Sequence, residues 1–230
     1  MAKLDPIWNR ARSDLIIATE HGETDVFLWE HSVRIAHSAQ RIAELPEIQE
    51  DSPDESAIVA AALYHDSGWI VRLLDGEIKR QDILLRQTPD AHREQGAAFM
   101  LRSLAELLPA PSLDLAATAI RTLNDRDIPI LEGRIVTEAE NLDDFGVLSL
   151  WPAVRRGALE GKGVKAVIDT WRRRKEYQFW TARLKDAFWF PAVRKIAEAR
   201  LAGFERFLEE LDSQQQGKDI DSVSPVESAR

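Results

Sequence analysis

An apolar run that ends in a charged pair decides the fold of this chain: residues 57–66 read AIVAAALYHD, so that Ala57 to Tyr64 lead directly into His65-Asp66. The uninterrupted apolar residues predict a buried helix. A buried imidazole beside a buried carboxylate is costly in free energy unless each group is hydrogen-bonded or holds a cation. The pair therefore indicates a metal site at the end of this helix.

Size and composition are those of an ordinary soluble domain. The chain has 230 residues, of which 44% are hydrophobic and 30% are charged, and this is enough for one hydrophobic core. No apolar stretch approaches the roughly 18 residues of a membrane span, and the N-terminus becomes acidic too early for a signal peptide. Because cysteine is absent, disulfides and cysteine zinc sites are excluded, and we expect a cytoplasmic location.

The formal net charge of −9 opposes binding to extended nucleic acid, which depends on neutralisation of phosphates by Lys and Arg. A small phosphorylated ligand in a local basic pocket is still compatible with this charge. The one basic cluster, Arg172-Arg173-Arg174-Lys175, has helical spacing and favours a solvated helix face over an anion site. We expect no membrane partner, and the sequence leaves a homodimer open.

Apolar residues recur at helical intervals almost throughout the chain, while the alternation typical of strands is nearly absent, which predicts an all-α fold. Ser52-Pro53-Asp54-Glu55 reads as a capping box with proline at the first helical position, and it predicts the start of the helix that ends at His65-Asp66. The other expected helices cover residues 5–19, 25–45, 88–108, 113–123, 135–145, 164–185 and 191–211.

The expected organisation is one helical domain over residues 1–212. Residues 25–146 form its motif-bearing core, and residues 164–212 form the closing helices. Residues 213–230, rich in Gln, Ser and Asp, predict a disordered tail. Two segments inside the domain lack a helical pattern: residues 69–87, a candidate lid or ligand-facing loop with an Asp75-Gly76 turn, and the Gly-containing stretch up to Gly163.

Two further residues complete a candidate ligand set. His31 lies in the middle of a predicted helix, with Arg34 one turn later, and Glu140 lies in another predicted helix. Together with His65-Asp66 they supply two imidazoles and two carboxylates from three helices. Such a mixed nitrogen and oxygen set suits Mn, Fe, Co, Ni or Zn, and Mg less well. The sequence therefore predicts a divalent metal site formed by His31, His65, Asp66 and Glu140.

This pattern resembles the HD superfamily of metal-dependent phosphohydrolases, which is named for the adjacent His-Asp pair. In that family an early His precedes the pair, and a later carboxylate lies in a segment that often reads Ala-Asp-x-Leu-Asp. The counterparts here are His31, His65-Asp66 and Glu140, and the resemblance covers residues 25–146. It implies a compact HD-domain-like helical bundle that hydrolyses a nucleotide or another small phosphorylated metabolite with a metal-activated water.

The chain departs from the family pattern in two places. Glu140 stands where the family usually has Asp, so the last ligand is either Glu140 or Asp143, one helical turn along. Many members also carry two further histidines that hold a second metal. His92 matches the first of them, but Asn124 stands near the second. The resemblance therefore implies a single metal ion.

The resemblance also implies roles around the metal. Asp66 would hold the metal and orient the water, and His92 would carry a proton. Arg34, Trp69 and Asn124 are the candidate substrate-binding residues, and Arg72 or Lys79 of the 69–87 segment would offset phosphate charge.

Other interpretations stay open from the sequence alone. The same site fits an HD-type hydratase or oxygenase that acts on a non-phosphate substrate, or a non-catalytic metal-binding or nucleotide-binding regulatory module. His65-Asp66 is also compatible with a hydrogen-bonding device at a helix C-terminus. The sequence Thr137-Glu138-Ala139-Glu140 fits a capping box, which would make Glu140 the start of a helix rather than a ligand.

Overall fold

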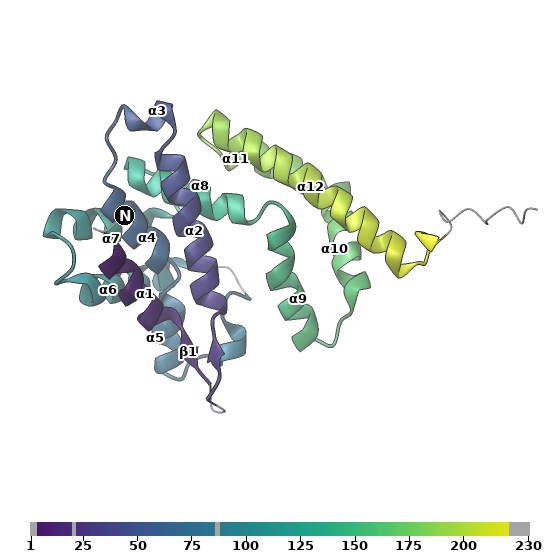
Figure 1. Cartoon of the computed structure of the whole chain (residues 1–230), viewed down its shortest axis with the longest axis horizontal. Helices are drawn as coiled ribbons and strands as arrows, with labels where there is room; N and C mark the ends of the chain where they lie inside the picture. The colour runs from purple at the N-terminus through teal and green to yellow at the C-terminus, as the bar shows by residue number, and fades with distance from the viewer. Residues whose placement is uncertain (1–3, 20–21, 86–87, 221–230) are drawn as a thin grey trace, which may run out of the picture. The chain divides into compact units, whose positions relative to one another are not determined.

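The computed structural model describes residues 4–19, 22–85 and 88–220, and these residues are mostly helical (Figure 1). The predicted all-α fold class is confirmed. The chain divides into two units, Met1–Asp143 and Asp144–Arg230, here called the N-terminal and the C-terminal unit. Within the described ranges, none of the helices combines the length and the apolar character that crossing a bilayer requires.

The N-terminal unit consists of helices and one short antiparallel strand pair. Its elements are α1 (Asp5–Leu15), β1 (Ile17–Ala18), β2 (Thr24–Asp25), α2 (Phe27–Ala43), α3 (Pro46–Gln49), α4 (Glu55–Tyr64), α5 (Gly68–Leu74), the 3-10 helix η1 (Arg80–Asp82), α6 (Asp90–Leu104), α7 (Ala110–Thr122) and α8 (Leu131–Asp143).

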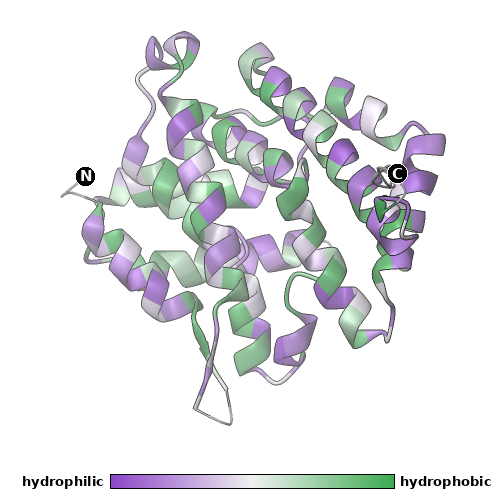
Figure 2. Ribbon diagram, turned by 45° about the vertical axis from the view of Figure 1, so that its right-hand side comes forward, coloured by the Kyte–Doolittle hydropathy of each residue, from purple (hydrophilic) through white to green (hydrophobic). Residues whose placement is uncertain are grey.

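Helix α4 lies at the centre of this unit. Every residue from Ala57 to Tyr64 is buried, and α2, α6, α7 and α8 all pack against the helix. Most helices around it are amphipathic, and Figure 2 shows hydrophobic and hydrophilic residues alternating along them. Because α4 is enclosed on all sides, the His65-Asp66 pair at its end is held inside the protein.

The start of α4 differs from the predicted capping box. The N-cap is Asp54, whose side chain accepts a hydrogen bond from the Ala57 N–H at 3.0 Å. The helix begins at Glu55, so Pro53 precedes it, and Ser52 adopts a left-handed backbone with φ of 49°. The predicted cap at Ser52 is therefore wrong by two residues, because Asp54 is the closer acceptor for the first turn.

The first part of the segment predicted as a lid is packed structure, whereas most of residues 74–82 are exposed. Residues 68–74 form α5, which packs against α6, and Trp69 and Ile70 are buried. Gly68 permits this contact, because a Cβ atom there would lie 2.3 Å from the backbone oxygen of His92. The predicted Asp75-Gly76 turn is present, with Gly76 at φ of 71°. Residues 86–87 of the segment lie outside the described residues.

The first helix is shorter than predicted. It ends at Leu15, and Ile16 is already extended, with ψ of 125°. Ile17 and Ala18 then pair with Asp25 and Thr24. The β-branched pair Ile16-Ile17 favours this extended backbone over a further helical turn.

The C-terminal unit contains η2 (Val147–Ser149), α9 (Leu150–Leu159), α10 (Val164–Glu176), α11 (Phe179–Asp186) and α12 (Pro191–Gln215). Its core is aromatic: Phe145 contacts Trp180 and Phe188 with ring centroids 5.2 and 5.4 Å apart. This core is what holds several short helices together.

Three expectations for this unit need correction. The stretch before Gly163 includes α9 and is not irregular throughout. The single helix expected over 164–185 is interrupted at Gln178, whose φ of 53° places it in the left-handed region that ends helices. Helix α12 continues to Gln215, past the residue at which the tail was expected to begin, and residues 221–230 of that tail lie outside the described residues.

Candidate metal centre

Three side chains converge where α2 passes the end of α4. His31 comes from α2, and His65 and Asp66 follow α4 directly. The Nε2 atoms of the two imidazoles lie 3.2 Å apart, and Asp66 Oδ2 lies 3.5 Å from His65 Nε2 and 3.6 Å from His31 Nε2. Ligands on a common cation, at bonds of about 2.1 Å, have about this spacing. The three donors therefore fit a divalent metal ion.

Hydrogen bonds on the far side of each ring point the Nε2 atoms inward. His65 Nδ1–H donates to the backbone oxygen of Ala62 at 2.8 Å, and His31 Nδ1–H donates to Asp143 Oδ2 at 3.1 Å. A proton fixed on Nδ1 leaves the Nε2 lone pair for a metal, and an acidic or carbonyl partner of this kind is typical of metal-binding histidines.

Asp66 is held so that only one of its oxygens faces the imidazoles. Its Oδ1 accepts hydrogen bonds from Thr88 Oγ1 at 2.7 Å and from Arg93 at 2.9 Å. Arg93 is only 3% exposed and also donates to the backbone oxygen of His65 at 3.1 Å. Since Oδ1 is occupied, Oδ2 is the oxygen that would bind a cation.

The two candidates for the last ligand occupy different places on α8. Asp143 lies behind His31 and forms a bidentate pair with Arg34, with both distances at 3.0 Å. Glu140 accepts a hydrogen bond from Arg93 at 2.6 Å. Neither carboxylate belongs to the group of three converging donors. Each of these carboxylates has an arginine partner, and whether α8 supplies the last ligand stays a prediction.

The protonation of the site follows from its burial and charges. Burial disfavours a charged His31, but hydrogen bonds to Asp143 and Asp66 outweigh it and raise the pKa of His31 to about 9. Burial lowers the pKa of His65. Without a metal these contacts favour a charged His31 and a neutral His65, and the Nε2–H of His31 faces His65 Nε2 at 3.2 Å and Asp66 Oδ2 at 3.6 Å. A cation at this place would therefore compete with a proton.

The two aspartates stay ionised. Burial opposes this in both cases, but the charges of Arg93 and His31 hold the pKa of Asp66 well below its usual range. Likewise, hydrogen bonds from His31 and Arg34 hold the pKa of Asp143 well below its usual range. Carboxylates that stay charged beside two imidazoles favour a cation.

His92 lies in a second polar cluster outside the three donors. Arg72 donates to His92 Nε2 at 2.5 Å and to Glu77 at 2.7 Å, and the Trp69 ring lies edge-on to His92 at 4.7 Å. Burial and the Arg72 charge lower the pKa of His92. Its buried Nδ1 has no partner among the described residues. Lys79 lies apart, at the start of η1.

Trp69 and Asn124 have structural contacts. Trp69 is 2% exposed, so it offers no open face for stacking. Asn124 donates to the backbone oxygen of Thr88 at 3.0 Å and to Asp90 at 2.8 Å. Because Thr88 also binds Asp66, Asn124 supports the segment that holds the metal-binding carboxylate.

The capping-box interpretation of Glu140 is wrong, because α8 begins at Leu131 and Thr137 and Glu140 lie in its interior. Sequence reasoning missed Thr88 and Arg93. Arg93 follows His92 directly, but no spacing rule distinguishes it from other arginines. Its role depends on contacts to Asp66 and Glu140, which lie 27 and 47 positions away in the sequence.

Comparisons with known proteins give a family match and several structural neighbours. The HD domain family model matches residues 28–144. Bacillus subtilis YpgQ in complex with ADP is 20% identical, with a TM-score of 0.60 over 93% of this chain and 95% of that one. A predicted HD superfamily hydrolase from an uncultured Thermotogales bacterium is 20% identical, with a TM-score of 0.55 and 92% of each chain covered.

An HD-superfamily hydrolase from Bacillus thuringiensis is 18% identical, with a TM-score of 0.58 over 94% of this chain and 97% of that one. No curated protein matches the sequence. The solved structures share the fold, and the family match includes all three converging donors, His31, His65 and Asp66. The chain belongs to the HD superfamily.

Proposed function

We propose that the protein is a metal-dependent phosphohydrolase that acts on a nucleotide or another small phosphorylated metabolite. The observation that carries this proposal is the convergence of His31, His65 and Asp66 within 4.8 Å of one another. They would hold one divalent cation, among Mn, Fe, Co, Ni, Zn and Mg. When bound, such an ion polarises a phosphoryl oxygen and lowers the pKa of water.

We assign the fourth protein ligand to Glu140. Both oxygens of Asp143 are occupied, one by Arg34 and the other by Arg34 and His31. Glu140 accepts from Arg93 through one oxygen only, and its side chain is 29% exposed. Its second oxygen is therefore the more accessible donor on α8.

The remaining polar residues position groups around the substrate. Asp66, anchored through Oδ1, orients the attacking water. Arg34 is fixed by Asp143 but uses only Nε and one terminal nitrogen there, so its other nitrogen is directed to a substrate phosphate. His92, which is hydrogen-bonded to Arg72, is the candidate proton carrier.

The charge of the chain and one structural neighbour support a small substrate. The net charge of −9 disfavours polymeric nucleic acid. The Bacillus subtilis neighbour is in complex with ADP, which supports a nucleotide as the ligand class. The absence of cysteine supports a cytoplasmic location.

The test is metal analysis coupled to substrate screening. Protein stripped with a chelator is reloaded with Mn, Co, Ni, Zn or Mg and assayed for phosphate release from nucleotides and sugar phosphates. We expect one metal per chain, and activity that requires it. Asp66→Asn should lose both metal and activity, while the matched exposed variant Asp144→Asn should keep both. Two irons with oxygen uptake, or full activity in Asp66→Asn, would contradict the proposal.

The last ligand has its own test. Glu140→Asp should keep more metal than Glu140→Gln, because charge matters more to a cation than one methylene. Equal metal content in the wild type and both variants would remove Glu140 from the ligand set.

A further inference from the structure

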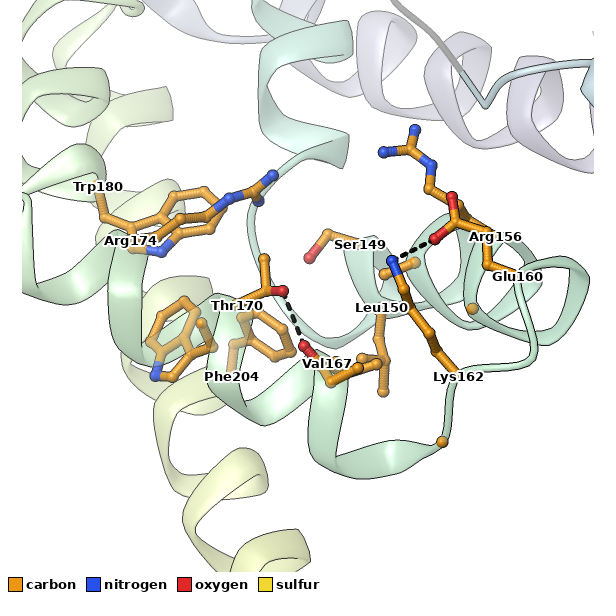
Figure 3. Close-up of a pocket in the computed structure, with 15 residues that line it drawn as sticks. Ser149, Leu150, Arg156, Glu160, Lys162, Val167, Thr170, Arg174, Trp180 and Phe204 are labelled. Atoms are coloured by element: carbon orange, nitrogen blue, oxygen red, sulfur yellow. Dashed lines mark hydrogen bonds and ion pairs between the residues drawn. The ribbon is translucent and has the colours of Figure 1, made fainter.

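The C-terminal unit contains a pocket of about 160 Å³ that shares no residue with the metal centre. Its walls come from α9, α10 and the loop between them, with Trp180 of α11 and Phe204 of α12 (Figure 3). A cavity of about 150 Å³ accommodates benzene, and drug-sized ligands need roughly 300 Å³ or more. The pocket therefore fits a single six-membered ring.

Three buried aromatic residues form one wall of this pocket. Trp171, Trp180 and Phe204 are 9%, 7% and 5% exposed. The ring centroid of Trp171 lies 5.4 Å from that of Trp180 and 4.9 Å from that of Phe204. Because these rings support one another, the wall is preorganised for a flat apolar group.

Trp180, one of the residues that line the pocket, carries a buried donor without a partner. Its Nε1 is buried and has no hydrogen-bond partner among the described residues. An indole N–H only donates, and a buried donor without an acceptor is destabilising.

Positive charge exceeds negative charge around the pocket. Its lining includes Arg156, Lys162 and Arg174 but only one carboxylate, that of Glu160. Lys162 donates to Glu160 at 2.5 Å, so this carboxylate is already neutralised. Figure 3 shows Arg174 along Trp180 on one side of the pocket, and Arg156 with the Lys162–Glu160 pair on the other side. In a chain of net charge −9, such a local excess favours an anion.

Arg174 is the cation best placed for a ligand. In the basic cluster of α10, Arg172 pairs with Asp212 at 2.6 Å and Lys175 pairs with Glu205. Arg174 has no carboxylate partner in the described part of the chain. Its guanidinium lies over the rings of Phe179 and Trp180, 5.1 and 5.7 Å from their centres. Stacking of this kind leaves the N–H groups at the guanidinium edge available to an anion.

We propose that this pocket binds a small aromatic anion, a single ring that bears a carboxylate or phosphate group. The ring packs against the wall of Trp171 and Trp180, and the anionic oxygens accept hydrogen bonds from Arg174. The volume, the aromatic wall and the charge of the lining all select this class. The proposal does not depend on the proposed phosphohydrolase activity.

The probes are benzoate, phenyl phosphate, benzamide and inorganic phosphate, titrated by calorimetry into the full chain in the presence of a chelator. We expect at least one of the two aromatic anions, benzoate or phenyl phosphate, to bind at least about tenfold more tightly than both benzamide and inorganic phosphate. Equal binding of benzamide would show that charge is not recognised. Equal binding of inorganic phosphate would show an adventitious anion site only. Either result, or no binding by either aromatic anion, would overturn the proposal.

Two variants locate the binding. Arg174→Gln should weaken binding by about tenfold, while Arg173→Gln, a neighbouring cation outside the pocket lining, should leave it unchanged. Ala153→Phe places a ring into the pocket from an exposed position of α9 and should abolish binding with unchanged helix content. Wild-type affinity in either Arg174→Gln or Ala153→Phe would contradict the proposal. Metal affinity should be unaffected in all three variants, whatever the function of the metal centre.

Discussion

Asp143 accepts a hydrogen bond from His31 Nδ1 at 3.1 Å, although the two residues are 112 positions apart in the sequence. This contact fixes the His31 tautomer and directs Nε2 toward His65 and Asp66. A carboxylate behind a metal-binding histidine orients the ring and strengthens it as a ligand. The relationship makes Asp143 a supporting residue of the metal centre.

Asp143→Asn should therefore weaken metal binding by about 10- to 100-fold without abolishing it. His31→Ala removes a ligand outright and should bind no metal. Calorimetric titration with Mn or Co measures both effects. Asp144→Asn changes the adjacent carboxylate, which pairs with Arg183 at 2.8 Å, and should behave as wild type. If Asp143→Asn loses metal as completely as His31→Ala, Asp143 is itself a ligand.

Arg93→Met should destabilise the metal-free protein strongly, because it leaves Asp66 buried without its cation. The loss of a partner from a buried ion pair costs about 3–5 kcal/mol. Saturating metal should restore part of this loss, since a bound cation would replace the missing positive charge. Urea unfolding with and without metal measures the free energy of unfolding in both states.

The control for this prediction is Arg121→Met. Arg121 pairs with Glu94, whose side chain is 60% exposed. The loss in the free energy of unfolding should therefore stay below about 1 kcal/mol. A loss in Arg93→Met as small as the loss in Arg121→Met would show that Arg93 does not compensate the Asp66 charge.

The stability of the metal-free protein should fall as the pH rises from about 6.5 to about 9. The pKa of His31 is raised from 6.5 to about 9, so the folded state holds this proton more tightly than the unfolded chain. The stabilisation is complete below pH 6.5, and it disappears as the pH passes 9. Its upper limit is about 3 kcal/mol.

Urea unfolding at several pH values in the presence of a chelator checks this dependence. The pKa of His65 is lowered, so His65 makes stability fall as the pH falls below 6.5. The pH range above 6.5 therefore reports on His31. His31→Gln should lose the dependence in that window. The same slope in the wild type and His31→Gln would assign it to another group.

Gly68→Ala should destabilise the N-terminal unit by roughly 1–3 kcal/mol. The added Cβ would lie 2.3 Å from the backbone oxygen of His92, so α5 and α6 would have to separate. Gly203→Ala is the matched control, because its Cβ meets only the far end of Arg206 at 3.9 Å, and it should stabilise α12 by about 0.5–1 kcal/mol. Thermal unfolding followed by circular dichroism compares them, and equal melting temperatures would contradict the predicted clash.

Local features of the fold were predictable from the sequence because they depend on neighbouring residues. The apolar run Ala57–Tyr64 predicted a buried helix, and all its residues are buried. Errors arose where tertiary contacts compete with local preference. Residues 69–87 look polar and loop-like in sequence, yet α5 forms there because Trp69 and Ile70 find a place against α6.

The candidate site shows the same division. The His65-Asp66 pair, the position of His31 and the resemblance to the HD pattern led to a prediction of four ligands. His31, His65 and Asp66 converge, and Glu140 lies outside that group. The choice between Glu140 and Asp143 was not predictable, since both lie on α8 one turn apart and carry the same charge. Their arginine partners, Arg93 and Arg34, distinguish them.

The sequence by itself determined that this protein is helical and that it carries a His-Asp pair at the end of a buried helix, and its motifs resemble those of the HD superfamily. The first two properties follow from periodicity and from the identity of adjacent residues. Only the tertiary structure decided which polar groups meet: Arg93 with Asp66 and Glu140, and Asp143 with His31. The physical reason is that partners distant in sequence are selected by how helices pack, and no local pattern records that packing.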